Sequence, residues 1–420
     1  MPVEQRPATP PAPCHSAGPL AGIRVLSNEV QVAGPYCSMT LADRGAEVIK
    51  LERPKYGDSA REGAPMVKNA AGERVSGYFM RFNRNKRSLT LNLREAKGKE
   101  IYKELAMRSD VVIDNLRPDS MNELGLGYPD LEPLHPGLIY VSISGFGTMQ
   151  ELKGVYAGRP AYDIVAQAMG GLMYTCGQEG GPPTWLGIAL GDLYSAALAV
   201  QGIMFALYER TKTGRGQYID VSMYDGIISL AERSITAYSL TGRVLERGIE
   251  PFIAPWGPFQ TQDGWIAIVV PTERDWSRFC EAMGRPDLAS VAGETDSGPA
   301  RAKNMREGFL KAIVESWFAG QTTQQVVDNL LAQGLPVGPV QNARDIFECP
   351  HAKERGALIE VDDPVAGRVK LVGPPIKMSN QMDCIARPAP RLGEHNEQVL
   401  GEVLGYTPEQ IEELRASGVL

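Results

Sequence analysis

The feature that most constrains the fold is the alternation of strand and helix patterns in the first half of the chain. A short apolar run, Ile23 to Ser27, is followed by Ala33-Gly34-Pro35 and an apolar helical pattern that ends near Gly45. A second run, Glu47 to Leu51, completes a strand–helix–strand unit of about 30 residues. Proline suits the first turn of a helix and glycine its end. This alternation predicts a largely parallel sheet with helices on both faces.

The same alternation continues and then loosens beyond Asp225. Further helices are predicted at 96–108 and 192–210, and strands at 110–113, 138–142 and 218–223. Downstream, prolines break the chain around a β-like run at 265–270 and helical stretches at 275–283, 308–318 and 324–332. We predict an α/β protein with a flexible Pro/Ala-rich lead (1–18), a large Rossmann-like domain built from both chain ends (19–230 and 340–420), and linkers with a smaller α+β domain in the middle (231–339). Residues 335–339 are the expected exit linker.

Composition excludes several classes of protein. A length of 420 residues exceeds what one hydrophobic core usually supports, and a net charge of −7 argues against a nucleic-acid binder. The apolar stretch Leu193 to Tyr208 is judged too short to span a membrane, and the N-terminus has no apolar core for a signal peptide. The six cysteines form no CxxC pair and the four histidines lack ligand spacing, so we expect reduced thiols, no metal site and a cytoplasmic location.

The first strand-to-helix turn lacks the glycine fingerprint of a dinucleotide site. It reads Val32-Ala33-Gly34-Pro35, with one glycine, and no P-loop pattern occurs. A nicotinamide dehydrogenase is therefore disfavoured. Basic residues nevertheless stand at the ends of several predicted strands. Arg53 and Arg117 follow strands, and the run Asn83 to Ser88 precedes a β-like run from Leu89 to Leu93. Ligands of open α/β sheets bind beyond the carboxyl ends of strands, so these residues either converge on an anionic ligand or are solvated loop charges.

Asp192 stands immediately before the long apolar helical pattern, after Gly187 to Gly191. Asp is a preferred N-cap, so a capping role is the simplest interpretation. The helix dipole at that position also favours the ionised carboxylate, which is the form that a nucleophile requires. The two roles are compatible.

Several ordered motifs together carry a family resemblance. They are Pro19 to Leu26, Leu41 to Glu52, Asn85-Lys86-Arg87-Ser88, Gly158 to Asp163 with Gln167-Ala168, Arg210 to Gln217, Pro390 to His395 and Leu404-Gly405-Tyr406. From about Pro19 to Leu420 the chain resembles the family III CoA-transferases, which include formyl-CoA transferase and the carnitine CoA-transferases.

This resemblance implies that Asp192 is the catalytic aspartate. In the family, this carboxylate attacks a donor thioester to give a mixed anhydride, and CoA then forms an aspartyl-CoA thioester. The acceptor carboxylate reverses the sequence and leaves as its CoA ester, with no metal, redox group or permanently bound cofactor. The thioester of coenzyme A is a substrate.

The resemblance also implies a set of CoA-binding residues. They are Val32, Ala33, Arg53, Leu91, Asn92, Leu93, Arg94, Asn115, Leu116, Arg117, Ser144, Gly145, Phe146 and Gly147. Two positions depart from the family pattern, because Glu123 replaces an arginine and Ser144 a lysine. Arg94 and Arg117 are the residues that would compensate.

Related α-methylacyl-CoA racemases are the main alternative enzymes. They place a histidine where this chain has Tyr162, and a tyrosine titrates too high to serve readily as that base. The chain also lacks the glycine run of the formyl-CoA transferases. By elimination we expect a bulkier acid as acceptor, either a dicarboxylate or an aromatic acid, with succinyl-CoA as a candidate donor. Trp256 and Phe252 either line the acyl pocket or pack in the core. The family implies an interlocked homodimer, and one subunit of a heteromeric transferase is the other interpretation.

Overall fold

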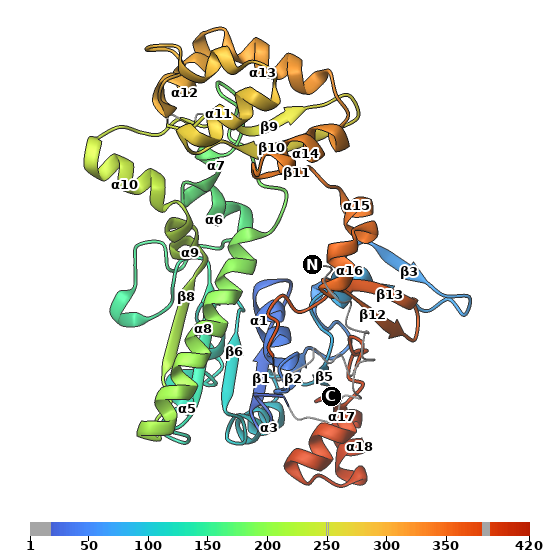
Figure 1. Ribbon diagram of the computed structural model, residues 1–420. Helices are drawn as coiled ribbons and strands as arrows, with labels where there is room; N and C mark the ends of the chain where they lie inside the picture. The colour runs from blue at the N-terminus through green and yellow to red at the C-terminus, as the bar shows by residue number, and fades with distance from the viewer. Residues whose placement is uncertain (1–17, 249, 251, 380–386) are drawn as a thin grey trace. The chain divides into compact units, whose positions relative to one another are not determined.

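The computed structural model describes residues 18–248, 250, 252–379 and 387–420 (Figure 1). The predicted lead up to residue 17, and with it Cys14, lies outside the described residues, as does Cys384. The chain divides into two compact units. The first comprises Met1–Gly177, Pro182–Leu245 and Gly356–Leu420, and the second Gln178–Gly181 and Glu246–Arg355.

A six-stranded sheet forms the centre of the first unit. Its strands are β1 (Arg24–Asn28), β2 (Glu47–Glu52), β5 (Lys86–Thr90), β6 (Val111–Asp114), β7 (Ile139–Ser144) and β8 (Tyr218–Ser222). Their order is β5-β2-β1-β6-β7-β8, and every neighbouring pair is parallel. The prediction of a mixed α/β fold with a parallel sheet is confirmed. The strand order reverses between β1 and β6, which is where open sheets of this type leave a crevice at their carboxyl ends.

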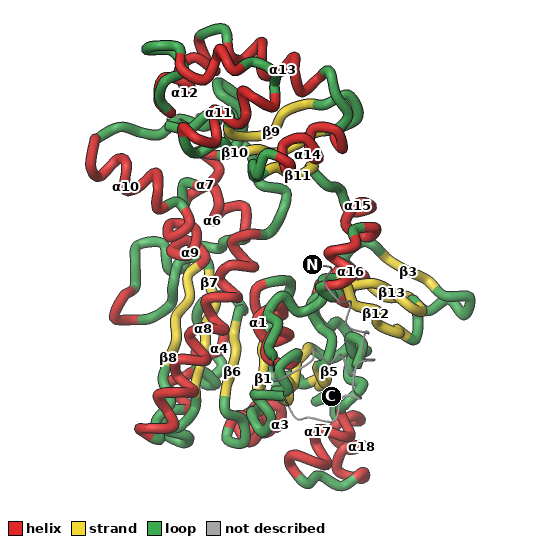
Figure 2. The backbone as a smooth tube through the Cα atoms, in the orientation of Figure 1, coloured by secondary structure: helices red, strands yellow, loops and turns green. Residues whose placement is uncertain are grey.

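Helices cover both faces of this sheet (Figure 2). On one face α1 (Ala33–Ala42) and α8 (Leu190–Thr213) share a buried apolar cluster with alternate residues of the strands. On the other face α3 (Ala96–Ala106) packs with residues of α17 (Asn396–Val399) and α18 (Pro408–Ala416). The end of the chain thus completes the core begun by its first half.

Shorter elements connect and edge these layers. In the first unit they are η1 (Ser59–Glu62), β3 (Met66–Lys68), β4 (Arg74–Ser76), α2 (Gly77–Met80), α4 (Ser120–Glu123), α5 (Tyr128–Leu131), η2 (Gln150–Leu152), α6 (Asp163–Met169), α7 (Leu172–Thr175), α9 (Met223–Leu230), α10 (Glu232–Thr241), β12 (Leu358–Asp363), β13 (Gly367–Val372) and the π-helical turn η4 (Leu400–Leu404).

The second unit has its own sheet and core. Its elements are β9 (Trp256–Gln260), β10 (Trp265–Val269), α11 (Glu273–Ala282), η3 (Pro286–Ser290), α12 (Gly298–Glu307), α13 (Leu310–Ala319), α14 (Thr323–Ala332), β11 (Val337–Pro339), α15 (Ala343–Glu348) and α16 (Pro350–Glu354). β11 pairs with β10 in an antiparallel sheet, so the expected exit linker at 335–339 is instead partly a strand of this unit. Core packing is also the wrong role for Phe252 and Trp256, whose exposed fractions are 62% and 49%.

Helix α8 corrects the expectation about membrane spanning. It has 24 residues and, among the described helices, is long and apolar enough by length and composition to cross a membrane. Its inward face carries small residues such as Ala196, Ala199 and Ala206, which are buried against α1 and the sheet. These small residues let the sheet and α1 pack closely against the helix.

Candidate active site

The predicted CoA-binding residues all lie beyond or at the carboxyl ends of neighbouring strands. Val32 and Ala33 follow β1, Arg53 follows β2, Leu91 to Arg94 follow β5, Asn115 to Arg117 follow β6, and Ser144 to Gly147 begin at the end of β7. Arg53, Arg94 and Arg117 are exposed. Val32, Ala33 and Leu91 are buried, so the prediction for these three residues reduces to contacts through backbone groups.

Hydrogen bonds join the loops after β1 and β6. The Val30 amide donates to Asn115 Oδ1 at 2.9 Å, and Asn115 Nδ2 donates to the Val30 carbonyl at 3.0 Å. A Cβ on Gly34 would lie 2.8 Å from Asn115 Oδ1, so glycine is the residue that fits there. Two predicted CoA loops are therefore held together at the point where the strand order reverses.

Four fully buried charges lie beneath the same loops. Lys86 Nζ lies 2.6 Å from Glu29 Oε1, and Lys50 Nζ lies 2.9 Å from Asp58 Oδ2. Asp58 Oδ1 also accepts a hydrogen bond from the Gln31 amide at 3.1 Å. Burial raises the pKa of Glu29, but Lys86 and Lys50 outweigh it and bring that pKa down to about 2. The ion pairs therefore fix the chain immediately before Val32.

Part of the basic run was assigned wrongly from the sequence. The strand begins at Lys86 and ends at Thr90, earlier than the predicted run from Leu89 to Leu93. Arg84 is buried and pairs with Asp43 at 2.6 Å, and Lys86 is buried against Glu29. Arg84 and Lys86 therefore form ion pairs with carboxylates inside the fold, and neither is an exposed loop residue that faces a ligand.

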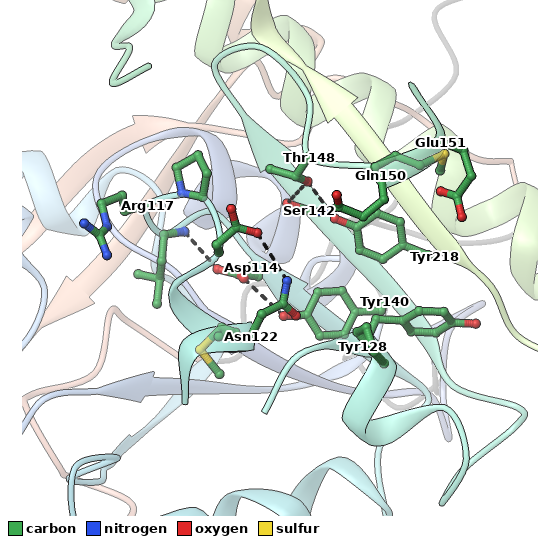
Figure 3. A pocket seen from close by; sticks show the side chains of 16 residues that line it. Asp114, Arg117, Asn122, Tyr128, Tyr140, Ser142, Thr148, Gln150, Glu151 and Tyr218 are labelled. Carbon is green, nitrogen blue, oxygen red and sulfur yellow. Dashed lines mark hydrogen bonds between the residues drawn. The ribbon is translucent and has the colours of Figure 1, made fainter. Parts of the chain in front are cut away.

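A cavity of about 400 Å³ adjoins the loop after β6 (Figure 3). Three tyrosine rings form one wall, with centroids 5.5 to 6.1 Å apart among Tyr128, Tyr140 and Tyr218. Burial raises the pKa of Asp114 to about 6, although the Leu116 amide and the Tyr140 hydroxyl both donate to this carboxyl. Aromatic faces with nearby polar groups suit a ligand that carries a flat ring.

The two departures from the family pattern affect local contacts. Arg117 Nη2 lies 2.9 Å from Glu123 Oε2, so the arginine expected to compensate is paired with the substituted residue. The Ser144 hydroxyl accepts a hydrogen bond from the Gly147 amide at 2.9 Å and shapes the turn after β7.

Asp192 lies in the first turn of α8, beside the buried carboxylate of Asp163. The helix begins at Leu190, so Asp192 is its third residue and the expected N-cap role is wrong. The N-cap is Ala189, which has no side-chain capping bond. Asp163, the first residue of α6, instead accepts a hydrogen bond from the Gly191 amide at 2.6 Å. Gln167 Nε2 also donates to both Asp163 oxygens, at 2.9 and 2.8 Å.

The environment of Asp192 raises its pKa to about 7. Burial is the largest cause, the negative charge of Asp163 adds to it, and Arg81 acts in the opposite direction. The expectation that the helix dipole would favour a fully ionised carboxylate is thus not met near neutral pH. A carboxylate with such a pKa is typical of a functional position and is a stronger base and nucleophile than an ordinary aspartate.

Arg81 was not singled out from the sequence, and Asp163 appeared only within a motif. Neither stands at a fixed spacing from Asp192 that a local pattern could detect. The basic and aromatic composition of Tyr78-Phe79-Met80-Arg81-Phe82 was the one available signal for Arg81.

Comparisons with known proteins show which family the chain belongs to. The model of CoA-transferase family III matches residues 20–396. Succinyl-CoA:mesaconate CoA-transferase of Haloarcula marismortui is 40% identical over 388 residues, covering 92% of this chain and 96% of the relative. Succinyl-CoA:glutarate CoA-transferase of Mus musculus is 33% identical, covering 98% of this chain and 92% of the relative.

A solved structure of a CAIB/BAIF family protein from Brucella suis superimposes with a TM-score of 0.81 at 31% identity, covering 92% of this chain and all of that one. The family model spans nearly the whole sequence, and the two relatives match over 96% and 92% of their length. The chain therefore belongs to CoA-transferase family III and is a CoA-transferase.

Proposed function

We propose that this enzyme transfers CoA from succinyl-CoA to a dicarboxylic acid, with Asp192 as the nucleophile. The relatives support the choice of substrates, because their names give succinyl-CoA with mesaconate, glutarate or L-malate. The observation that carries the catalytic assignment is the partly buried Asp192 carboxylate, whose pKa is raised to about 7 at the start of α8.

The proposed reaction consists of four nucleophilic substitutions, and Asp192 takes part in each as nucleophile, as acyl carrier or as leaving group. Asp192 attacks the succinyl thioester carbon, the C–S bond breaks, and CoA leaves as thiolate. The thiolate attacks the aspartyl carbonyl of the anhydride, so succinate departs and an aspartyl-CoA thioester remains. The acceptor carboxylate then displaces the thiolate, which attacks the acceptor carbonyl and restores Asp192. Amide groups at the start of α8 are suited to stabilise the oxyanions that form.

We propose that the loops after β1, β2, β5, β6 and β7 bind CoA. The exposed Arg53, Arg94 and Arg117 provide positive charge for its phosphates, and the buried turn residues provide backbone groups. The tyrosine-walled cavity next to Leu116 and Arg117 gives space and aromatic surface for part of the nucleotide.

An isotope experiment tests this mechanism directly. The acceptor acid, labelled with ¹⁸O in its carboxylates, is incubated with enzyme and succinyl-CoA. The mass of the released succinate is then measured by mass spectrometry. The sequence of steps predicts one ¹⁸O atom per succinate after the first turnover, because the label passes through Asp192. Hydroxylamine trapping should also modify Asp192 and leave an Asp192→Ala variant unmodified. Unlabelled succinate together with no Asp192 adduct would overturn the proposal.

We further propose that the chain acts as a homodimer with interlocked subunits. The alternative is a heteromer of two different chains. Two relatives from Chloroflexus aurantiacus, 36% and 34% identical, are named as the beta and alpha subunits of a succinyl-CoA–L-malate CoA-transferase. Activity of the purified chain alone, at the mass of a dimer, supports the homodimer. Activity that requires a second, different chain would overturn it.

A further inference from the structure

Among the residues that the structure describes, aromatic rings contact the guanidinium of Arg81 and no carboxylate pairs with it. Arg81 directly follows α2, and its Cζ lies 3.8 Å from the ring centroid of Tyr78 and 4.5 Å from that of Phe82. Its Nε atom is buried and has no hydrogen-bond partner in the described part of the chain. A buried donor without a partner is costly, so such an atom indicates a group that a ligand completes.

Neighbouring arginines show the contrast. Arg61 lies 3.8 Å from the ring of Phe79 and is paired with Glu52 at 2.6 Å. Arg84 is buried and paired with Asp43 at the same distance. Stacking fixes the plane of the Arg81 guanidinium through its faces, which leaves its edge oriented for a planar partner.

Ring contacts link the segment of Arg81 to the layer that α1 and α8 form on the sheet. The Phe82 ring packs on Tyr36 of α1, with centroids 5.3 Å apart. Tyr36 packs against the buried cluster that α1 and α8 share with the sheet. The charges of Arg81 and Asp192 also shift the pKa of each other. Burial lowers the pKa of Arg81, Tyr78 and then Asp192 raise it, and Arg81 in turn lowers the pKa of Asp192.

We propose that Arg81 binds the carboxylate at the far end of a dicarboxylic substrate while Asp192 reacts at its near end. This inference rests on the proposed function. A four- or five-carbon diacid carries a second negative charge into a partly buried site, and that charge needs a desolvated partner. A stacked guanidinium offers a carboxylate two parallel N–H donors, which fixes both charge and orientation. Arg81 thereby selects diacids in both halves of the reaction.

The test compares a diacid thioester with its uncharged analogue. Butyryl-CoA has the chain length of succinyl-CoA but a methyl group in place of the far carboxylate. In Arg81→Met we expect kcat/KM for succinyl-CoA to fall by about 10- to 100-fold, the effect of losing a charged hydrogen-bonded pair, with no comparable fall for butyryl-CoA. Arg81→Lys should recover part of the loss, because the ammonium keeps the positive charge but cannot donate two parallel hydrogen bonds to the carboxylate. Equal losses for both thioesters would overturn the proposal.

Inhibition by the free acids gives a second measurement that needs no turnover of butyryl-CoA. Succinate should inhibit the wild type more strongly than butyrate, and Arg81→Met should abolish this difference. Lys212→Met is the matched control, since Lys212 lies 4.1 Å from the Tyr208 ring at the other end of α8. A difference between the acids that persists in Arg81→Met would also overturn the proposal. If the wild type transfers CoA from no donor, the proposed function itself fails, which is a separate result.

Discussion

Asp163 caps a helix to which it does not belong, through the bond of 2.6 Å from the Gly191 amide to its Oδ1 atom. It begins α6, whereas Gly191 is the second residue of α8. Because Asp192 is the next residue, this capping interaction places a second carboxylate beside the proposed nucleophile. The same contact stabilises the helix start and raises the pKa of Asp192.

Replacing Asp163 should therefore shift the pH dependence of the reaction. A nucleophilic carboxylate must be ionised, so wild-type kcat/KM should rise with pH through about 7, the raised pKa of Asp192. In Asp163→Asn the negative charge is lost while an oxygen remains to accept from Gly191, and this rise should move to lower pH. The measurement is a kcat/KM profile from pH 5 to 9. Asp225→Asn, at an exposed first-turn position of α9, should leave the profile in place.

Asp192 should also lower the free energy of unfolding at neutral and alkaline pH. Its folded pKa of about 7 exceeds the ordinary 3.8, so between these values the native state binds more protons than the unfolded state. Stability from this group therefore falls as pH rises from about 4 to 7. Asp192→Asn should raise the free energy of unfolding at pH 8 by on the order of 2 kcal/mol, allowing for partial exposure, and by little at pH 4. A gain that is equal at both pH values would contradict this account.

The buried pair of Glu29 and Lys86 makes the opposite pH prediction. The pKa of Glu29 in the folded protein is about 2, below the ordinary 4.5. Glu29 therefore contributes stability above pH 4.5 that is lost as pH falls towards 2. Glu29→Gln leaves Lys86 and Lys50 buried with less negative charge, and should cost about 3 kcal/mol at pH 7. Chemical denaturation at pH 7 and pH 3 checks this, and the cost should be smaller at the lower pH. Glu354→Gln, at an exposed position of α16, is the control.

Glu123 should weaken CoA binding because it neutralises Arg117. The two side chains lie 2.9 Å apart and are well exposed, so the pair itself stabilises the fold by about 1 kcal/mol or less. Glu123→Gln should free Arg117 for the CoA phosphates and lower KM for succinyl-CoA by about two- to fivefold, with kcat unchanged. Arg117→Ala should raise the same KM. An unchanged KM in both variants would remove Arg117 from the proposed CoA site.

The strands and helices that were predicted correctly from the sequence share one property: each is encoded by a pattern within a short stretch of the chain. The strands and helices of the first half follow from apolar runs of fixed period, so β1, α1, β2 and the later strands could be predicted from short windows. The segment 335–339 failed as a linker because its Pro and Gly residues are compatible with an antiparallel edge strand, and only β10 decides that pairing.

The candidate site was predicted in part. Asp192 and the strand-end loops were identified from motifs, and they remain predictions until the experiments above are made. Lys86 was misread because an isolated lysine in a sequence is usually solvated, while this one is buried by Glu29, 57 residues away along the chain. Arg81 carried no spacing signal towards Asp192 at all.

The sequence by itself determined the alternating α/β architecture and the residues that stand at the ends of its strands, because side-chain periodicity and turn chemistry act over a few neighbouring positions. The tertiary structure alone decided that Asp163 caps α8, that Asp192 has a pKa near 7, and that Arg81 stacks on Tyr78 while its charge acts on Asp192. Each of these depends on burial and on charges brought together from distant segments, where electrostatic interactions are strong because water is excluded.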